Sequence, residues 1–409
     1  MLGAIALRNL ARNRRRTALA LLVVASGAAA LLLTIGFMRY SFNGLREALI
    51  RGGLGHLEVA PVPDIGGSDA GPDRAALPSF RGWRDVRDAI ESMPHVVGAA
   101  GAIVMHGLVA CDERTLPFVG AGLETDREQR MQFRVRPKEG RPLPVTPPAL
   151  GEDEALLGLG LARQLGANVG DSVTLTVFTN DGVLNALDVR VGGLITTGIQ
   201  DLDERFLRTH LVTAQRVLDT DAVSSLIVML DDTRETEQTR KQIAHSVGPR
   251  LGVTDWQARA PFYGQVRALY GGIFAFLGSV VLVLVCLSSS NTLLMTVMER
   301  TREIGSLLAI GTSKGQVVRM IVLEAAWLGL IGGALGSLLG LALTAVIHAL
   351  RIEMPPPPGA VETMTLRLEV VAWDPLWVTV LTVAMLVVSA AVPAWRVARL
   401  RIAEALVHV

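Results

Sequence analysis

Four long apolar stretches stand out in the pattern of hydrophobic and polar positions along the chain. They cover residues 18–38, 269–298, 320–350 and 375–395. Each is long enough to cross a bilayer as a helix, which takes about 20 residues. A long stretch of mixed polarity, residues 39–268, separates the first from the second. The pattern therefore predicts a polytopic α-helical membrane protein with four transmembrane helices and one large domain inserted between the first two.

The inserted stretch 39–268 carries short periodic segments typical of an α+β domain. Gly52, Gly53 and Gly55 should end the helix that continues from the first span. Alternation on both sides of Asn180-Asp181-Gly182 predicts a β-hairpin, because Asp-Gly suits a tight turn. We expect two lobes, the second beginning near Glu154 with a helix that ends at Gly166. Strands are expected at His56–Ala60, Val96–Ala110, Leu116–Ala121 and Ser224–Leu230, and helices at Trp83–Met93 and Thr233–Val247.

The N-terminal 17 residues are predicted to form an amphipathic cytoplasmic helix at the membrane interface. A simple basic anchor explains them equally well. The Arg14-Arg15-Arg16 cluster followed by an apolar run also resembles a secretion signal. A signal core has only about 7–15 apolar residues, and this run is longer, which favours an uncleaved span.

Composition narrows the function classes. Half of the 409 residues are hydrophobic and 19% are charged, below the roughly 25% typical of soluble domains. The net charge of +1 gives no general attraction to nucleic acid. We find no HExxH, GxSxG or paired CxxC motif, so no catalytic residue and no metal site is predicted. The chain also lacks a GxxxxGK[ST] motif and is expected to bind no cofactor itself.

Basic clusters near span ends indicate orientation. Arginines precede the first span, four basic residues lie in the loop 299–319, and three arginines follow the fourth span in the tail 396–409. Because Lys and Arg mark the cytoplasmic side, both termini and this loop should be cytoplasmic. The domain 39–268 and the short loop 351–374 should then be extracytoplasmic. The prolines Pro355–Pro358 predict a stiff extended segment there, to which we assign no function.

The third span carries two features of interest. Gly332, Gly336 and Gly340 repeat every four residues and should form a face that another helix approaches closely. Glu324, an intramembrane acid, is a functional candidate by default, although structural pairing with a basic residue near the interface is the favoured interpretation. Four spans make a poor channel, so we expect a second copy or a paralogue to complete the assembly.

The loop 299–319 combines charge with an apolar stripe. Ile304, Leu307 and Leu308 share one side of a predicted short helix, Gly311 can end it, and Ser313 with Gln316 can cap the next. Such a projecting amphipathic helix suits docking in a groove of another protein. A solvated, well-capped loop would explain the charges but not the apolar stripe.

The segment Glu299-Arg300-Thr301-Arg302-Glu303-Ile304-Gly305, followed by Ala309-Ile310-Gly311, resembles the signature of FtsX-like ABC transporter permeases. The resemblance extends over the chain. It includes Arg8-Asn9-Leu10 with Arg14–Thr17, Leu165-Gly166 with Gly170-Asp171 in a MacB-like periplasmic core domain, Glu324, and Pro393-Ala394 with Glu404–Leu406. Leu308 and Ile402 depart from the family pattern, in which a basic residue and a proline are frequent.

The resemblance implies a permease of the bacterial inner membrane that docks on a cytoplasmic ABC ATPase dimer in a 2+2 assembly. ATP and Mg²⁺ would bind the ATPase, and its movement would reach the domain 39–268 by mechanotransmission. The start of the chain and the Gly55–Val59 strand look most like the lipoprotein-release branch. The ATPase-coupling residues implied are Glu299, Arg300, Arg302, Glu303, Ile304, Gly305, Leu307, Leu308 and Gly311.

Three functions remain open from the sequence. The leading one is extraction of lipoprotein or lipid from the outer face of the inner membrane, with the cargo or a periplasmic partner contacting residues 39–268. The alternatives are drug or peptide efflux with a periplasmic adaptor, and non-transport regulation of cell-wall hydrolases or peptide sensing. The sequence decides neither the cargo nor whether the permease pair is homomeric.

Overall fold

The structure is a computed structural model that describes residues 14–62, 79–133, 137–179, 181–197, 200–354 and 364–399. The chain divides into two compact units. The helical unit comprises Met1–Asn43, Val266–Met354 and Thr365–Val409, and the sheet unit comprises Gly44–Gln265 and Pro355–Met364. Pro355–Pro358 and most of the predicted N-terminal helix and C-terminal tail lie outside the described residues.

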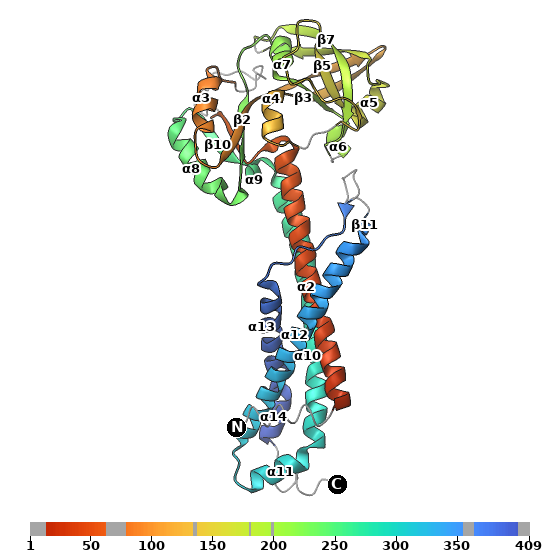
Figure 1. The fold of residues 1–409 in the computed structure, drawn as a ribbon, viewed down its shortest axis with the longest axis vertical. Helices are drawn as coiled ribbons and strands as arrows, with labels where there is room; N and C mark the ends of the chain where they lie inside the picture. The colour runs from red at the N-terminus through yellow and green to blue at the C-terminus, as the bar shows by residue number, and fades with distance from the viewer. Residues whose placement is uncertain are drawn as a thin grey trace. The chain divides into compact units, whose positions relative to one another are not determined.

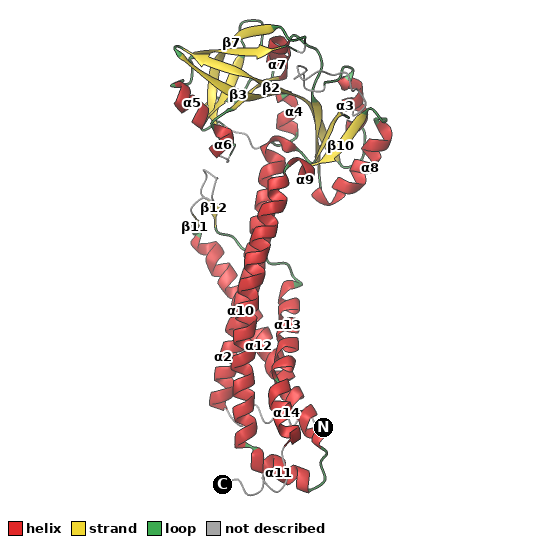
Figure 2. Ribbon diagram, turned by 180° about the vertical axis from the view of Figure 1, so that it is seen from behind, coloured by secondary structure: helices red, strands yellow, loops and turns green. Residues whose placement is uncertain are grey.

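Within the described residues, the helical unit contains four helices long and apolar enough to cross a membrane, as predicted. They lie side by side in Figures 1 and 2. Hydrocarbon offers no hydrogen-bonding groups, so a segment that crosses it must pair its own backbone N–H and C=O groups, as a helix does. The spans are α2 (Arg14–Leu49), α10 (Pro261–Glu299), α12 (Lys314–Leu350) and α13 (Asp374–Ser389) continued by α14 (Ala391–Arg399). The short helix α11 (Thr301–Ala309) joins α10 to α12, and β11 (Glu353–Met354) and β12 (Met364–Thr365) are two-residue strands.

The sheet unit is a mixed α/β domain inserted between the first and second spans. Its ten strands form one sheet in the order β10-β1-β9-β2-β3-β8-β5-β7-β4, and β6 pairs with β2 and β7. The strands are β1 (Leu57–Pro61), β2 (Val96–Cys111), β3 (Arg114–Leu123), β4 (Glu139–Gly140), β5 (Glu154–Gly158), β6 (Ser172–Phe178), β7 (Leu184–Ile195), β8 (Phe206–His210), β9 (Ser225–Leu230) and β10 (Leu251–Asp255). The helical segments are η1 (Ile50–Leu54), α3 (Trp83–Glu91), α4 (Thr125–Arg130), α5 (Leu159–Leu165), α6 (Gln200–Asp203), α7 (Leu211–Leu218), η2 (Thr233–Glu235), α8 (Thr236–Ser246) and α9 (Trp256–Arg259).

The two lobes predicted from the sequence are two parts of this single sheet. The first half of β2 pairs with β9, and its second half pairs with β3 and β6. Because one strand takes part in both halves, the backbone hydrogen bonding is continuous between them (Figure 2). The hairpin predicted around Asp181-Gly182 is present, because β6 and β7 pair antiparallel with Phe178 opposite Leu184. Asn180, the first residue of the predicted turn, lies outside the described residues.

One element prediction is wrong. The helix expected before Gly166 begins only at Leu159, and Glu154–Gly158 instead forms strand β5. All five residues of β5 are buried, between β7 on one side and β8 on the other. A short apolar run buried on both faces looks the same in a sequence whether it forms a strand or a helix. Pairing with two neighbouring strands decides the outcome.

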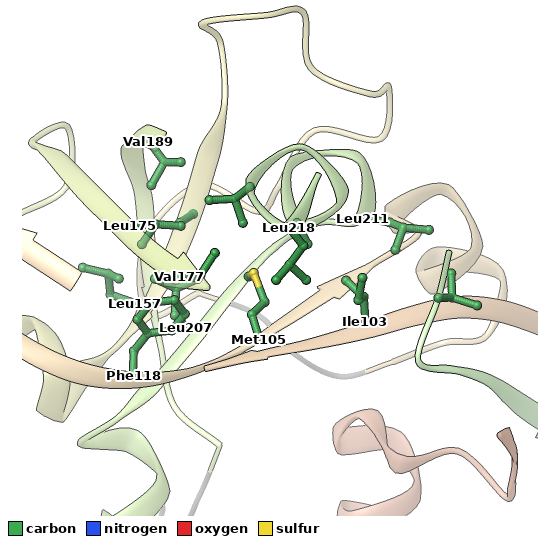
Figure 3. Packing of buried hydrophobic residues seen from close by; sticks show 14 of the residues in the cluster. Ile103, Met105, Phe118, Leu157, Leu175, Val177, Val189, Leu207, Leu211 and Leu218 are labelled. Carbon is green, nitrogen blue, oxygen red and sulfur yellow. The ribbon is translucent and has the colours of Figure 1, made fainter. Parts of the chain in front are cut away.

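The main core of the sheet unit lies between the sheet and α7. Leu211, Ala214, Val217 and Leu218 of α7 are buried at helical spacing. Figure 3 shows Leu211 and Leu218 facing the sheet residues Ile103 and Met105. A second cluster gathers Ile50, Trp256 and Tyr263 close to the ends of the two long helices.

The chain enters the sheet unit after α2 and leaves it into α10, and the strands at these two points are neighbours in the sheet. β1 follows α2 and η1, β10 precedes α9 and α10, and the two strands pair antiparallel with Leu57 opposite Asp255. Arg259 ties this end together, since Nε lies 2.7 Å from Glu58 Oε2 and Nη1 donates to Leu54 O at 2.7 Å. Gly55 has a φ of +67°, and a Cβ there would lie 2.4 Å from Ile227 Cγ2. Glycine is therefore required where η1 ends.

Candidate functional site

The candidate site is α11, and specific caps fix how it lies. Gly311 has a φ of +102°, and its N–H donates to Leu308 O while Thr312 N–H donates to Leu307 O. This pair of bonds is a Schellman motif, which ends a helix at a residue in the left-handed region. Ser313 and Gln316 then form the predicted capping box at the start of α12. In Figure 1, α11 lies across the end of the helix bundle.

The predicted coupling residues divide between two faces of α11. Ile304, Gly305 and Leu308 are buried, and Ile304 and Leu308 belong to one apolar cluster with Val297 of α10 and Val317 of α12. This inner face attaches α11 to two spans. The residues we call the outer face of α11 are exposed: Arg302, Glu303, Leu307 and Ile310. Ile310 lies outside the apolar spans and is 84% exposed. The outer face therefore offers apolar surface to a partner.

Arg300 does not belong to the exposed face. Its side chain is 19% exposed, Nε donates to Glu303 Oε2 at 2.9 Å, and Nη1 lies 3.8 Å from Glu324 Oε2. Glu324 is therefore near the basic residue at the α10–α11 junction. The pair places a positive and a negative charge between α11 and α12, where low polarity strengthens their attraction.

The predicted glycine face of α12 packs against the first span. A Cβ at Gly336 would lie 2.5 Å from Ala25 O, and Cβ atoms at Gly332 and Gly340 would lie within 3 Å of Val24 and Leu32. The absence of side chains lets the two backbones approach closely. Gly329 and Gly333 form a second face, where a Cβ would meet the backbones of Val383 and Thr379 in α13. α12 thus packs closely against both of its neighbours.

Sequence reasoning missed an ion pair between two of the spans. Arg39 of α2 forms a bidentate ion pair with Asp374, the first residue of α13, and Nη2 donates to Oδ1 at 2.9 Å. The signal for this contact in the sequence was that each of the two residues borders an apolar run. Their separation in sequence hid the pairing.

Side chains that could bind a metal do not gather in the part of the chain that the structure describes. Its His, Cys, Asp and Glu side chains form no group of three or more able to hold a metal ion. Cys111 and Cys286 are free thiols. The ionisable clusters of the sheet unit are ion pairs. Burial raises the pKa of Glu128, and Arg208 at 3.0 Å opposes that rise.

Comparison with known proteins agrees with these features. The model for the MacB-like periplasmic core domain matches residues 17–246, and that for the FtsX-like permease C-terminal region matches residues 272–402. The chain is 24% identical to the lipoprotein-releasing system transmembrane protein LolC of Xylella fastidiosa, over 98% of each chain. It is 25% identical to LolC of Neisseria meningitidis, over 78% of this chain and 75% of that protein.

A third relative combines two activities in its name. The macrolide export ATP-binding/permease protein MacB of Sodalis glossinidius is 23% identical over 85% of this chain and 53% of that protein. Together, the matched regions cover both the sheet unit and the later spans. The chain is a multi-pass ABC transporter permease that belongs to the FtsX-like family and carries a MacB-like periplasmic core domain.

Proposed function

We propose that this chain is the membrane subunit of an ABC transporter that extracts lipoprotein or lipid from the outer face of the inner membrane, driven by a separate ATPase. The similarity to LolC over almost the whole of both chains supports the lipoprotein branch. The chain contains no P-loop motif, so ATP, Mg²⁺ and the energy of hydrolysis are assigned to a partner chain.

The single observation that carries the proposal is the two-faced structure of α11. Its inner face is buried against α10 and α12, and its outer face presents Leu307 and Ile310. A partner that pushes on the outer face would move both spans at once, because the inner face is packed like a protein core. In this proposal α11 and both termini are cytoplasmic, on the strength of the basic clusters.

Mechanotransmission is part of the proposal. α2 and α10 each extend from the helical unit into the sheet unit. They continue into β1 and β10, which pair with each other and are tied by Arg259 and Glu58. A change in the positions of the two helices would therefore act on adjacent strands of one sheet. The cargo need not cross the membrane core.

Site-specific photo-crosslinking tests the docking role. A photo-reactive phenylalanine analogue is placed at Leu307 or Ile310 of the full chain, expressed in cells that also produce the candidate ATPase. Both positions should yield adducts with a P-loop protein. Phe178, an equally apolar and 69% exposed residue of the sheet unit, is the matched control and should yield none. Absence of adducts at both α11 positions would contradict the docking role.

One observation favours a second function. The macrolide export relative covers 85% of this chain, so efflux with a periplasmic adaptor is the alternative. Deletion of the gene separates the two proposals. Drug sensitivity together with co-purification of an adaptor indicates efflux, whereas accumulation of lipoproteins in the inner membrane indicates extraction. Whether the second permease subunit is a copy or a paralogue is decided by the same purification.

A further inference from the structure

The segment Leu368–Asp374, which we call the strap, connects three spans through polar contacts. Leu368 N–H donates to Nε2 of His348 in α12 at 3.0 Å, and Glu369 N–H donates to Gly36 O in α2 at 3.0 Å. Asn43 Nδ2 donates to Glu369 Oε2 at 2.7 Å. The strap thus runs from the end of α12, across α2, to the start of α13.

The Arg39–Asp374 pair closes this strap. Asp374 is 10% exposed, accepts two N–H groups of Arg39 and also accepts the N–H of Val371 at 2.7 Å. A carboxylate held by a bidentate arginine and a backbone N–H has a fixed orientation. Arg39 Nη1 also reaches Glu369 O at 3.3 Å. The contacts of Arg39 therefore run along the strap as well as to its end.

Backbone packing reinforces the same grouping of helices. Below the strap, α2 and α13 both lie against glycine faces of α12, and Ser337 of α12 donates to Pro375 O of α13 at 3.1 Å. α10 differs. Only 6% of its most apolar 18-residue window is buried, compared with 33% for each of the other three spans. α10 thus buries less of its apolar window than the other three spans, although Val285 lies against Gly27 of α2 and Phe274 against Phe37.

We propose that Arg39 and Asp374 are positioning residues that keep the strap closed throughout the transport cycle, so that α2, α12 and α13 move as one body. Relative movement among the four spans then involves α10, which α11 joins to α12 at one end. This consequence rests on the proposed function. Closure of the strap is independent of the proposed function, because it can be measured without an ATPase.

A disulfide reports closure directly. A Cβ at Gly36 lies 3.5 Å from Leu368 Cβ, within the roughly 3.5–4.5 Å that a disulfide requires. The full chain carrying Gly36→Cys and Leu368→Cys, in a Cys286→Ser background, should oxidise readily. Arg39→Gln should slow oxidation several-fold. Arg367→Gln, which removes an exposed arginine from the neighbouring position, is the matched control and should not. Equal rates in both variants would overturn the role of Arg39.

ATP hydrolysis by the same chain, assembled with its ATPase in proteoliposomes, tests whether α2, α12 and α13 move as one body. ATP is the only probe added. Arg39→Gln should lower ATP hydrolysis several-fold under reducing conditions, and oxidation of the cysteine pair should restore it. If Arg39→Gln acted only by lowering the stability of the whole protein, one local disulfide would not be expected to restore hydrolysis. In the chain with Arg39 intact, oxidation should leave hydrolysis unchanged. Arrest by the disulfide would show that the strap must open, and would overturn the proposal. If no ATPase binds, the oxidation rates still decide closure, and only the proposed function fails.

Discussion

Arg300, at the junction of α10 and α11, lies with Nη1 3.8 Å from Oε2 of Glu324 in α12. The same guanidinium donates to Glu303 of α11 at 2.9 Å. One side chain therefore links the candidate coupling helix to the span that follows it. This link complements the apolar contacts of Ile304 and Leu308 and makes α11 part of the helical unit.

The Arg300–Glu324 pair predicts non-additive mutations. Arg300→Gln leaves Glu324 in a site of low polarity without its cation, whereas the double variant Arg300→Gln/Glu324→Gln removes both charges. We expect the double variant to be more stable than the sum of the single effects predicts, with an interaction energy of about 0.5–3 kcal/mol. Thermal unfolding of the four purified proteins in detergent measures it. Strict additivity would show that the two charges do not interact.

The glycine face of α12 predicts a sharp steric effect. Gly336→Ala places a methyl group 2.5 Å from Ala25 O, and the first span must shift to accept it. The expected loss of stability is about 1–3 kcal/mol, as for other overpacked sites. Gly278→Ala in α10 is the control, because no atom lies within 4 Å of its new methyl group. A Gly336→Ala protein that melts like the control would argue against close packing of α2 on α12.

A buried carboxylate in the sheet unit predicts a large effect on stability. Asp153 is fully buried, accepts from Thr213 Oγ1 at 2.5 Å and pairs with Arg216 Nη1 at 2.9 Å. Asp153→Ala leaves Thr213 without this acceptor and leaves Arg216 only the carbonyls of Pro148 and Ala149, and it should cost about 1–3 kcal/mol. Asp221→Ala removes an exposed partner of Arg81 and should change stability by at most about 1 kcal/mol. Urea unfolding of the sheet unit within the full chain measures both.

His56 predicts a pH dependence with a defined direction. Leu230 N–H donates to its Nδ1 at 3.1 Å, so the ring proton is on Nε2, which lies 3.0 Å from Thr233 Oγ1. Burial lowers the pKa of His56 to about 4. Between about pH 6.5 and 4 the unfolded chain therefore binds a proton that the folded chain does not. Stability should fall by up to about 3 kcal/mol as the pH falls through this window.

The charges around His56 belong to Glu47, Arg51, Arg46 and Asp231, and other acids of the domain titrate in the same range. The measurement is therefore a comparison with His56→Gln, which has no proton to gain. The difference in unfolding free energy between the two proteins should change across pH 4–6.5 and stay constant above it. A constant difference throughout would mean that the folded and unfolded chains bind the proton equally.

Local signals in the sequence predicted much of the helical unit. The caps at Gly311 and Ser313, the break after α2 and the glycine repeat of α12 depend on neighbouring residues or on helical spacing. They did not reveal that Gly332, Gly336 and Gly340 face α2 while Gly329 and Gly333 face α13. That division depends on how separate helices pack, which residue spacing within one helix does not encode.

Contacts between distant segments account for the rest. β5 is a strand because β7 and β8 pair with it, although its composition suited a helix. Arg39 and Asp374 are separated by most of the chain, and no periodic pattern links them. Arg300 belongs to the predicted coupling motif, yet its guanidinium is only 19% exposed and lies between Glu303 and Glu324. Charge alone did not separate residues that brace α11 from those available to a partner.

ATP hydrolysis and lipoprotein release measured together test whether movement of an ATPase enters this chain through the outer face of α11, as we propose. Leu307→Asp alters that face without touching the buried residues that hold α11 in place. In spheroplasts containing the ATPase, we predict that release of newly made lipoprotein is lost while the melting temperature of the purified variant stays at the wild-type value. Wild-type release per ATP hydrolysed in this variant would contradict the account.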